Sequence, residues 1–218
     1  MDMSVVLRGY RFSVYNRIAR VTLHEKRVPY GIEEIDPFSE RVPQRYMRRQ
    51  PFGRVPVLSH GSFDVYETAA IGRYIDAKFD GPPLVPTEVE SLTRLAQTRS
   101  IIDSYGYEPM VRQVFAHRVF SPAMGETSDE TEIEDGLAAS KTVLTALEAL
   151  AAEAHVLDKR TFTLADCHLA PMIAYFVQAP EGEAALKSYP ALSDWWEWTA
   201  QRASIVETDP GPPGKPIA

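Results

Sequence analysis

Residues 51–75 read PFGRVPVLSHGSFDVYETAAIGRYI and decide the fold of this chain. The runs 54–59 and 63–66 are rich in Val, Leu, Phe and Tyr, which favour a pleated strand. Between them, residues 60–62 read His-Gly-Ser, and Gly61 supplies the backbone freedom that a hairpin turn requires. A helix is expected to open at Glu67-Thr68. The stretch therefore predicts a β-hairpin that leads into a helix.

Two features of this stretch indicate a binding site. Pro56 interrupts a strand-like run with a residue that has no N–H. A cis bond before proline costs only about 0.5–1 kcal/mol, and a cis Val55–Pro56 bond would turn the backbone of Val55 outward toward an extended ligand. The first N–H groups of a helix have no internal partner and would hold a carboxylate at Thr68, while Glu67 would match an amine. The expected ligand is a peptide with a free amine and a free carboxylate.

The residues before this stretch complete an alternating pattern. Residues 4–8 (SVVLR) predict a buried strand, 14–27 an amphipathic helix, and 30–35 a second strand parallel to the first. Residues 37–50 are basic and predict a short helical piece. The order β-α-β-α-β-β-α is a thioredoxin-like arrangement.

Residues 80–86 (DGPPLVP) predict a linker, because three prolines and a glycine cannot continue a helix. Strand signals disappear after it. Helices are expected at 87–120, with a kink at Pro109, and at 132–154, 164–178 and 191–202. Thr163-Leu-Ala-Asp166 predicts a capping box that starts the third of these. The predicted division is a domain at 1–79, the linker at 80–86, an all-helical domain at 87–205 and a Pro/Gly-rich tail at 206–218.

Composition limits the classes of function. The chain has 218 residues, of which 44% are hydrophobic, and a formal net charge of −7. An acidic protein is a poor partner for nucleic acid or an anionic membrane, and no apolar run approaches the roughly 18 residues of a membrane span. With no visible secretory signal, a cytoplasmic location is expected. The lone Cys167 excludes an internal disulfide and is expected to be buried, and no ligand spacing predicts a metal site.

The motifs of this chain resemble those of the cytosolic glutathione S-transferase family. PFGRVPVL followed by YETAAIGRYI resembles the glutathione-binding half of the family, and the box at 163–166 resembles the start of its inner helix. Ser13-Val-Tyr-Asn-Arg17 is similar to the S-x-x-x-R motif of Ser-type classes (phi-, zeta- or theta-like, bacterial). The resemblance covers essentially the whole chain. It implies an α/β thioredoxin-like N-terminal domain followed by an all-α helical domain.

The resemblance also implies a reaction. Glutathione would bind in an extended pose along Val55 with its γ-glutamyl end at Glu67 and Thr68. The hydroxyl of Ser13 would stabilise the glutathione thiolate, which attacks a hydrophobic electrophile without a metal. Arg54 and Arg41 are candidates for glutathione contacts, the latter at the glycine carboxylate.

Alternatives remain open for each of these roles. Ser13 also fits a simple helix N-cap, and Tyr15 or Asn16 could face the sulfur instead. Candidates for the electrophile pocket are Tyr10, Tyr105, Tyr107 and Met110. The family implies a homodimer lined by helix 87–120 and a role in detoxification. A glutathione-dependent isomerase or dehalogenase, or a non-catalytic binding module on the same fold, are the competing functions.

Overall fold

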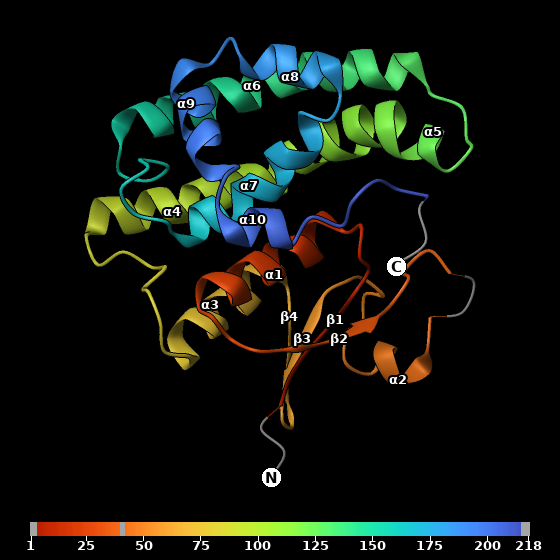
Figure 1. Cartoon of the computed structure of the whole chain (residues 1–218), viewed down its shortest axis with the longest axis vertical. Helices are drawn as coiled ribbons and strands as arrows, with labels where there is room; N and C mark the ends of the chain where they lie inside the picture. Colours follow the sequence, from red (N-terminus) through yellow and green to blue (C-terminus); the bar gives the residue numbers. More distant parts are fainter. Residues whose placement is uncertain (1–3, 40–41, 215–218) are drawn as a thin grey trace. The chain divides into compact units, whose positions relative to one another are not determined.

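The computed structural model describes residues 4–39 and 42–214, and it divides into two compact units, Met1–Leu84 and Val85–Ala218. Figure 1 labels the elements of each unit. The first unit mixes strands and helices, and the described part of the second contains helices only.

The first unit contains a four-stranded sheet with the order β2-β1-β3-β4. Its elements follow the chain in the predicted order β-α-β-α-β-β-α; they are β1 (Val5–Gly9), α1 (Val14–Glu25), β2 (Gly31–Glu34), α2 (Gln44–Met47), β3 (Val57–His60), β4 (Phe63–Tyr66) and α3 (Thr68–Lys78). As the sequence predicts, β2 is parallel to β1. Strand β3 runs antiparallel to both β1 and β4.

Side chains on the two faces of the sheet pack into separate clusters, because successive residues of a strand point to opposite sides. Leu7 and Leu58 pack with Leu23 of α1 and Ile75 of α3 on one face. On the other face, Val57 packs with the fully buried Tyr46 of α2 and with residues around it. The sheet is thus covered by α1 and α3 on one side and by α2 on the other.

The hairpin differs from its sequence prediction at one end. Strand β3 begins at Val57 rather than at Arg54. Pro56 lacks the N–H that a further ladder bond would need, so the pairing starts after it. The turn is formed by Gly61 and Ser62, and the positive φ of Gly61 (60°) is the conformation that favours glycine.

A buried ion pair fastens the end of the first unit. Lys26 Nζ lies 3.2 Å from Asp76 Oδ1 of α3 and donates to the carbonyl of Pro82 at 3.1 Å. The same carboxylate oxygen accepts from the backbone N–H of Leu84 at 2.8 Å. Part of the predicted linker is therefore bonded to the first unit.

The second unit has more helical segments than the sequence indicates. They are α4 (Val89–Ile101), the π-helical segments η1 (Ile102–Gly106) and η2 (Glu108–Phe120), α5 (Ser121–Ala123), α6 (Glu130–Glu153), α7 (Leu164–Phe176), α8 (Pro180–Leu186), α9 (Pro190–Thr199) and α10 (Ala203–Glu207). The change from α- to π-type hydrogen bonding begins at Ile102, before the Pro109 to which the sequence assigned a kink. The helix also continues to Ala123, beyond its predicted end at residue 120.

Two short helices were not predicted. In α8, Gly182 weakens a helical pattern, but a Cβ at this position would lie 2.1 Å from the carbonyl oxygen of Phe176, so close packing requires glycine. The other, α10, extends into the segment expected to be a tail without regular structure. Thr208, just beyond it, is buried and donates to the carbonyl of Ser204 at 2.6 Å.

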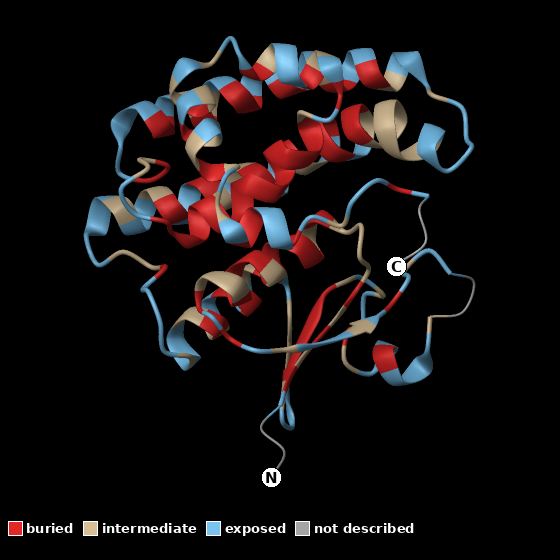
Figure 2. Ribbon diagram, in the orientation of Figure 1, coloured by how far each residue is buried: buried red, intermediate tan, exposed pale blue. Residues whose placement is uncertain are grey.

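Helix α7 is the buried centre of the second unit, and every one of its residues is buried (Figure 2). The predicted capping box is present: Asp166 accepts from the backbone N–H of Thr163 at 2.7 Å, and the Thr163 hydroxyl oxygen accepts from Ala165 N–H at 3.2 Å. Trp195 of α9 donates its indole N–H to Asp166 at 2.8 Å. Cys167 is buried in the same helix, as expected.

Candidate functional site

The register of the sheet brings three segments of the motif to one edge. Arg8 of β1 pairs with Val57 of β3, and Val57 pairs with Tyr66 of β4. Because β3 is antiparallel to both neighbours, the end of β1, the start of β3 and the end of β4 lie at the same edge. The loop that carries Ser13, the Val55–Pro56 bond and the start of α3 are therefore neighbours, although up to about 55 residues of chain separate them.

Ser13 forms the mouth of α1. Its Oγ accepts a hydrogen bond from the backbone N–H of Asn16 at 3.3 Å, so it is the N-cap of the helix. Its own N–H donates to the carbonyl of Tyr10 at 2.9 Å. A hydroxyl has one donor besides two acceptor positions, so the N-cap bond leaves the O–H of Ser13 available to donate to a ligand. The N-cap and thiolate-binding interpretations are compatible.

The two alternatives to Ser13 lie in different surroundings. Asn16 is buried, its exposure being 2%, and its side-chain amide donates to the carbonyl of Tyr10 at 3.1 Å. It packs against Gly9, where a Cβ would lie only 2.2 Å from Asn16 Oδ1. Asn16 thus packs against the loop between β1 and α1 and stabilises it. Tyr15 is half-buried on α1.

At the second segment, the Val55–Pro56 peptide bond is cis. Val55 is half-buried, and within residues 4–39 and 42–214 its N–H and C=O pair with no other backbone group. The hydroxyl of Tyr46 donates to the carbonyl of Arg54 at 2.6 Å and so holds the preceding residue in place. No sequence pattern indicated this role of Tyr46. The arrangement leaves Val55 able to pair with an extended ligand.

The third segment is the mouth of α3. Glu67 is exposed and has φ 68° and ψ 116°, and its side chain makes no capping bond to the helix. A non-glycine residue with positive φ is strained by about 1–3 kcal/mol, and such residues cluster at functional sites. Thr68 is the first helical residue and is buried.

The two candidate arginines differ in what the structure describes. Arg54 is exposed next to Val55. Arg41 lies outside the described residues. Arg45 and Arg49 belong to the same basic run as Arg41. Each forms an ion pair with a carboxylate of the sheet.

The electrophile-pocket candidates fall in both units. In the first, Tyr10 is half-buried and packs edge-to-face on Phe12 and Phe38, with ring centroids 5.7 and 6.0 Å apart. Burial and the nearby carboxylates of Asp36 and Glu34 raise the pKa of Tyr10, so it keeps its proton at neutral pH.

In the second unit, the three candidates differ in exposure. Tyr105 is 67% exposed, Tyr107 is half-buried, and Met110 is 1% exposed. Met110 therefore packs in the helical core, near Gly106.

The described residues contain no group of three or more His, Cys, Asp or Glu side chains that could hold a metal ion. Nor is any described helix both long enough and apolar enough to cross a bilayer.

Comparison with known proteins assigns both halves of the chain. Residues 7–83 match the model of the glutathione S-transferase N-terminal domain, and residues 130–197 match that of the C-terminal domain. Glutathione S-transferase F10 of Arabidopsis thaliana is 32% identical over 194 residues, which cover 87% of this chain and 89% of that protein. The chain belongs to the glutathione S-transferase family.

Solved structures agree with this assignment at the level of the fold. Glutathione S-transferase III in its apo form superposes with a TM-score of 0.84 at 24% identity, over 99% of this chain and 100% of that chain. Glutathione S-transferase-I bound with lactoylglutathione gives 0.80 at 23% identity, over 94% and 98%. The predicted glutathione S-transferase fold, a thioredoxin-like domain followed by a helical domain, is confirmed.

Proposed function

We propose that this member of the glutathione S-transferase family is a glutathione transferase in which the glutathione thiolate attacks a hydrophobic electrophile. The observation that carries this proposal is the sheet edge where the Ser13 hydroxyl, the backbone of Val55 and the mouth of α3 lie together. This edge belongs to the half of the chain that matches the family's N-terminal domain.

Ser13 is the proposed catalytic residue. To be a thiolate at neutral pH, a thiol must lower its pKa by about two units, which corresponds to roughly 2.7 kcal/mol. One hydrogen bond to a charged acceptor contributes about 1.5–3 kcal/mol, and a helix N-terminus adds about 0.3–1 kcal/mol. The O–H of Ser13 supplies the hydrogen bond, and its position at the start of α1 adds the effect of the helix N-terminus. These two contributions are sufficient, so no further residue is needed.

Glutathione is the proposed co-substrate, held in an extended pose. Its backbone pairs with Val55, and its γ-glutamyl end binds at Glu67 and at the first N–H groups of α3, next to Thr68. Arg54 is the described arginine next to this edge and can hold a carboxylate with two parallel hydrogen bonds. The lactoylglutathione in the related structure is a glutathione derivative, which supports this class of ligand.

The electrophile is proposed to bind against the helical unit, with Tyr105 and Tyr107 as its contacts there. The protein is further proposed to act in the cytoplasm, in detoxification, as a symmetric homodimer. The exposure of Val89 (72%) and Leu92 (44%) on α4 supports an apolar contact along that helix.

Substitution of Ser13 tests the catalytic assignment. Ser13→Ala is expected to lower kcat/KM for conjugation of glutathione to a chloronitrobenzene by about 10- to 150-fold near neutral pH, because one charge-assisted hydrogen bond is lost. The pKa of bound glutathione, followed by thiolate absorbance against pH, should rise in parallel.

The N-cap role of Ser13 requires a matched control. Ser13→Gly also lacks the hydroxyl, but glycine costs an N-cap only a few tenths of a kcal/mol. Equal losses of activity in the alanine and glycine variants, with different stabilities in urea, would assign the loss to the hydroxyl. Unchanged conjugation in both variants would exclude Ser13 as the catalytic residue.

The choice of substrate tests the type of reaction. Turnover of a cis-dienone or haloaromatic instead of the chloronitrobenzene would favour the isomerase or dehalogenase alternative.

A further inference from the structure

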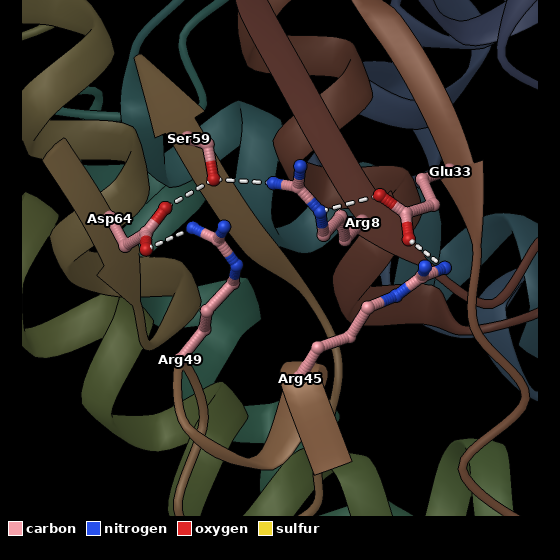
Figure 3. Close-up of polar contacts among 6 residues, drawn as sticks. All are labelled: Arg8, Glu33, Arg45, Arg49, Ser59 and Asp64. Carbon is pink, nitrogen blue, oxygen red and sulfur yellow. Dashed lines mark hydrogen bonds and ion pairs between the residues drawn. The ribbon is translucent and has the colours of Figure 1, made fainter. Parts of the chain in front are cut away.

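A chain of polar side chains crosses the sheet on the face covered by α2 (Figure 3). Arg8 of β1 donates through Nε to Glu33 of β2 at 2.6 Å and through Nη1 to the hydroxyl of Ser59 on β3. Ser59 in turn donates to Asp64 of β4. One residue from each strand takes part, which fixes the guanidinium of Arg8 at the centre of the sheet.

Two further arginines, one in α2 and one just after it, reach this chain over the same face of the sheet. Arg45 of α2 donates to Glu33 at 3.1 Å, and Arg49 donates to Asp64 (Figure 3). The sequence predicted a ligand contact for Arg41 of this basic run but assigned no role to Arg45 or Arg49. The structure pairs two of its arginines, Arg45 and Arg49, with the two carboxylates of this chain.

The space between these groups is a cavity of about 330 Å³. It is lined by Arg8, Glu33, Arg45, Tyr46 and Arg49. This volume lies at the lower end of the range for small-molecule pockets, about 300–1,000 Å³. The cavity therefore has room for a small molecule and belongs entirely to the first unit.

The charges around the cavity favour an anion. Three guanidinium groups face two carboxylates, Glu33 and Asp64, which leaves one positive charge in excess within a chain whose net charge is −7. A guanidinium carries five N–H donors, and the bonds described here use two from Arg8 and one each from Arg45 and Arg49. Donors remain on all three arginines after the carboxylates are satisfied.

Arg45, at the exposed side of the cavity, can exchange its ion-pair partner. The Arg45 side chain is 72% exposed, so its ion pair with Glu33 is largely solvated and contributes little to stability. Arg45 can turn from Glu33 to a ligand at small cost, whereas Arg8 is 16% exposed and stays in position. Burial raises the pKa of Tyr46, and its hydroxyl donates to Arg54, so Tyr46 contributes its ring rather than a charge.

We propose that this cavity, on the sheet face covered by α2, is a second ligand site whose lining includes none of the proposed glutathione contacts Ser13, Val55 and Glu67, and that it binds a small tetrahedral oxyanion such as inorganic phosphate or a phosphate monoester. Guanidinium groups match such anions because their planar donors form two parallel hydrogen bonds to two oxygens. Arg8 forms the base of the site, and Arg45 and Arg49 close it. The carboxylates of Glu33, which itself lines the cavity, and of Asp64 orient the arginines through their ion pairs.

Titration with inorganic phosphate and, separately, with phenyl phosphate tests this site, using calorimetry on the full chain at constant ionic strength set with chloride. Saturable binding of one anion per chain is expected. Arg45→Gln and Arg49→Gln should each weaken the affinity about tenfold or more, because a charge-assisted hydrogen bond is lost. Arg48→Gln is the matched control, since Arg48 belongs to the same basic run but does not line the cavity; its affinity should change less than about twofold.

Three results would overturn the proposal. They are the absence of saturable binding of both anions, equal weakening by Arg48→Gln and Arg45→Gln, and competitive displacement of phosphate by glutathione. Binding of phenyl phosphate but not of inorganic phosphate would assign the site to monoesters, within the proposal. Circular dichroism of each variant checks folding, and the high exposure of Arg45 makes its substitution compatible with the fold.

Discussion

Glu67 combines a strained backbone conformation with a proposed role in binding. Its φ of 68° and ψ of 116° lie outside the regions that side-chain-bearing residues prefer, yet it is exposed and caps nothing through its side chain. Its backbone carbonyl accepts from Ile71 N–H at 2.9 Å and so starts the hydrogen-bond ladder of α3. Glu67 is therefore the residue at the mouth of the helix, where we propose that a ligand amine binds.

Replacing Glu67 by glycine is expected to separate stability from binding. Glycine adopts positive φ without strain, so Glu67→Gly should keep or raise the free energy of unfolding, by up to about 2 kcal/mol. The KM for glutathione should rise about tenfold or more, because a charged partner of the amine is lost. Urea unfolding and glutathione-dependent kinetics measure the two effects.

Glu67→Gln is the control for charge, since it keeps the side-chain shape and the backbone strain. It should leave the free energy of unfolding within about 0.5 kcal/mol of the parent value while it weakens glutathione binding. A glycine variant that is much less stable, with unchanged KM, would show that Glu67 has a structural role alone.

The start of α7 shows how an element is fixed by a buried carboxylate. Asp166 is fully buried, accepts from both the N–H and the hydroxyl of Thr163, and accepts from the indole of Trp195. Burial raises the pKa of Asp166 to about 6, although the bonds from Thr163 and Trp195 oppose this shift. One side chain thus joins the N-terminus of α7 to α9.

This raised pKa predicts a pH dependence of stability. The folded pKa of about 6 exceeds the ordinary value of 3.8, so the folded state binds the proton more tightly than the unfolded state. Asp166 therefore contributes stability that is fully present below pH 4 and is lost as the pH rises through 6, on the order of 3 kcal/mol in total. Asp166→Asn lacks this titration.

The destabilisation caused by Asp166→Asn should consequently be larger at pH 4 than at pH 7, by up to that amount. Urea unfolding of both proteins at the two pH values measures it, and Asp80→Asn, at an exposed carboxylate, should show no such difference. A destabilisation that grows with pH would mean that the hydrogen bonds to the ionised carboxylate outweigh its burial.

At the scale of the whole molecule, exposed apolar side chains indicate where a second chain could bind. Phe52 is 68% exposed in the first unit, and Val89, Leu92 and Tyr105 are exposed in the second. Apolar area left in water is unfavourable by roughly 25 cal/mol per Å². A symmetric dimer that covers α4 would remove this cost for Val89 and Leu92.

Charged substitutions on α4 test the proposed dimer. The double variant Val89→Asp/Leu92→Glu should shift the molecular mass measured by light scattering from two chains to one, because burying an unpaired charge in an interface is costly. Met124→Glu, at an apolar residue that is 51% exposed outside α4, should leave the mass unchanged. A parent protein that is already monomeric at micromolar concentration would exclude the dimer.

The sequence by itself determined the elements whose signals are local. The Thr163–Asp166 capping box and the hairpin around Gly61 follow from hydrogen-bonding groups and side-chain periods within a few residues. The parallel β1–β2 pair follows from the β-α-β order of the predicted elements. The same local motifs were sufficient to indicate the family. Helices α8 and α10 were missed because short helices have weak periodic patterns, and their stability comes from packing.

The family resemblance predicted that Ser13, Val55 and Glu67 serve one site, but only the tertiary structure showed how these residues come together. The sheet register brings Ser13, Val55 and Glu67 to one edge, and it aligns Arg8 with Glu33 across neighbouring strands. The structure also shows that Met110 is buried and that Arg45 and Arg49 line the same cavity. These relations join residues far apart in the chain, and they depend on strand pairing and side-chain packing, which no local pattern of amino acids specifies.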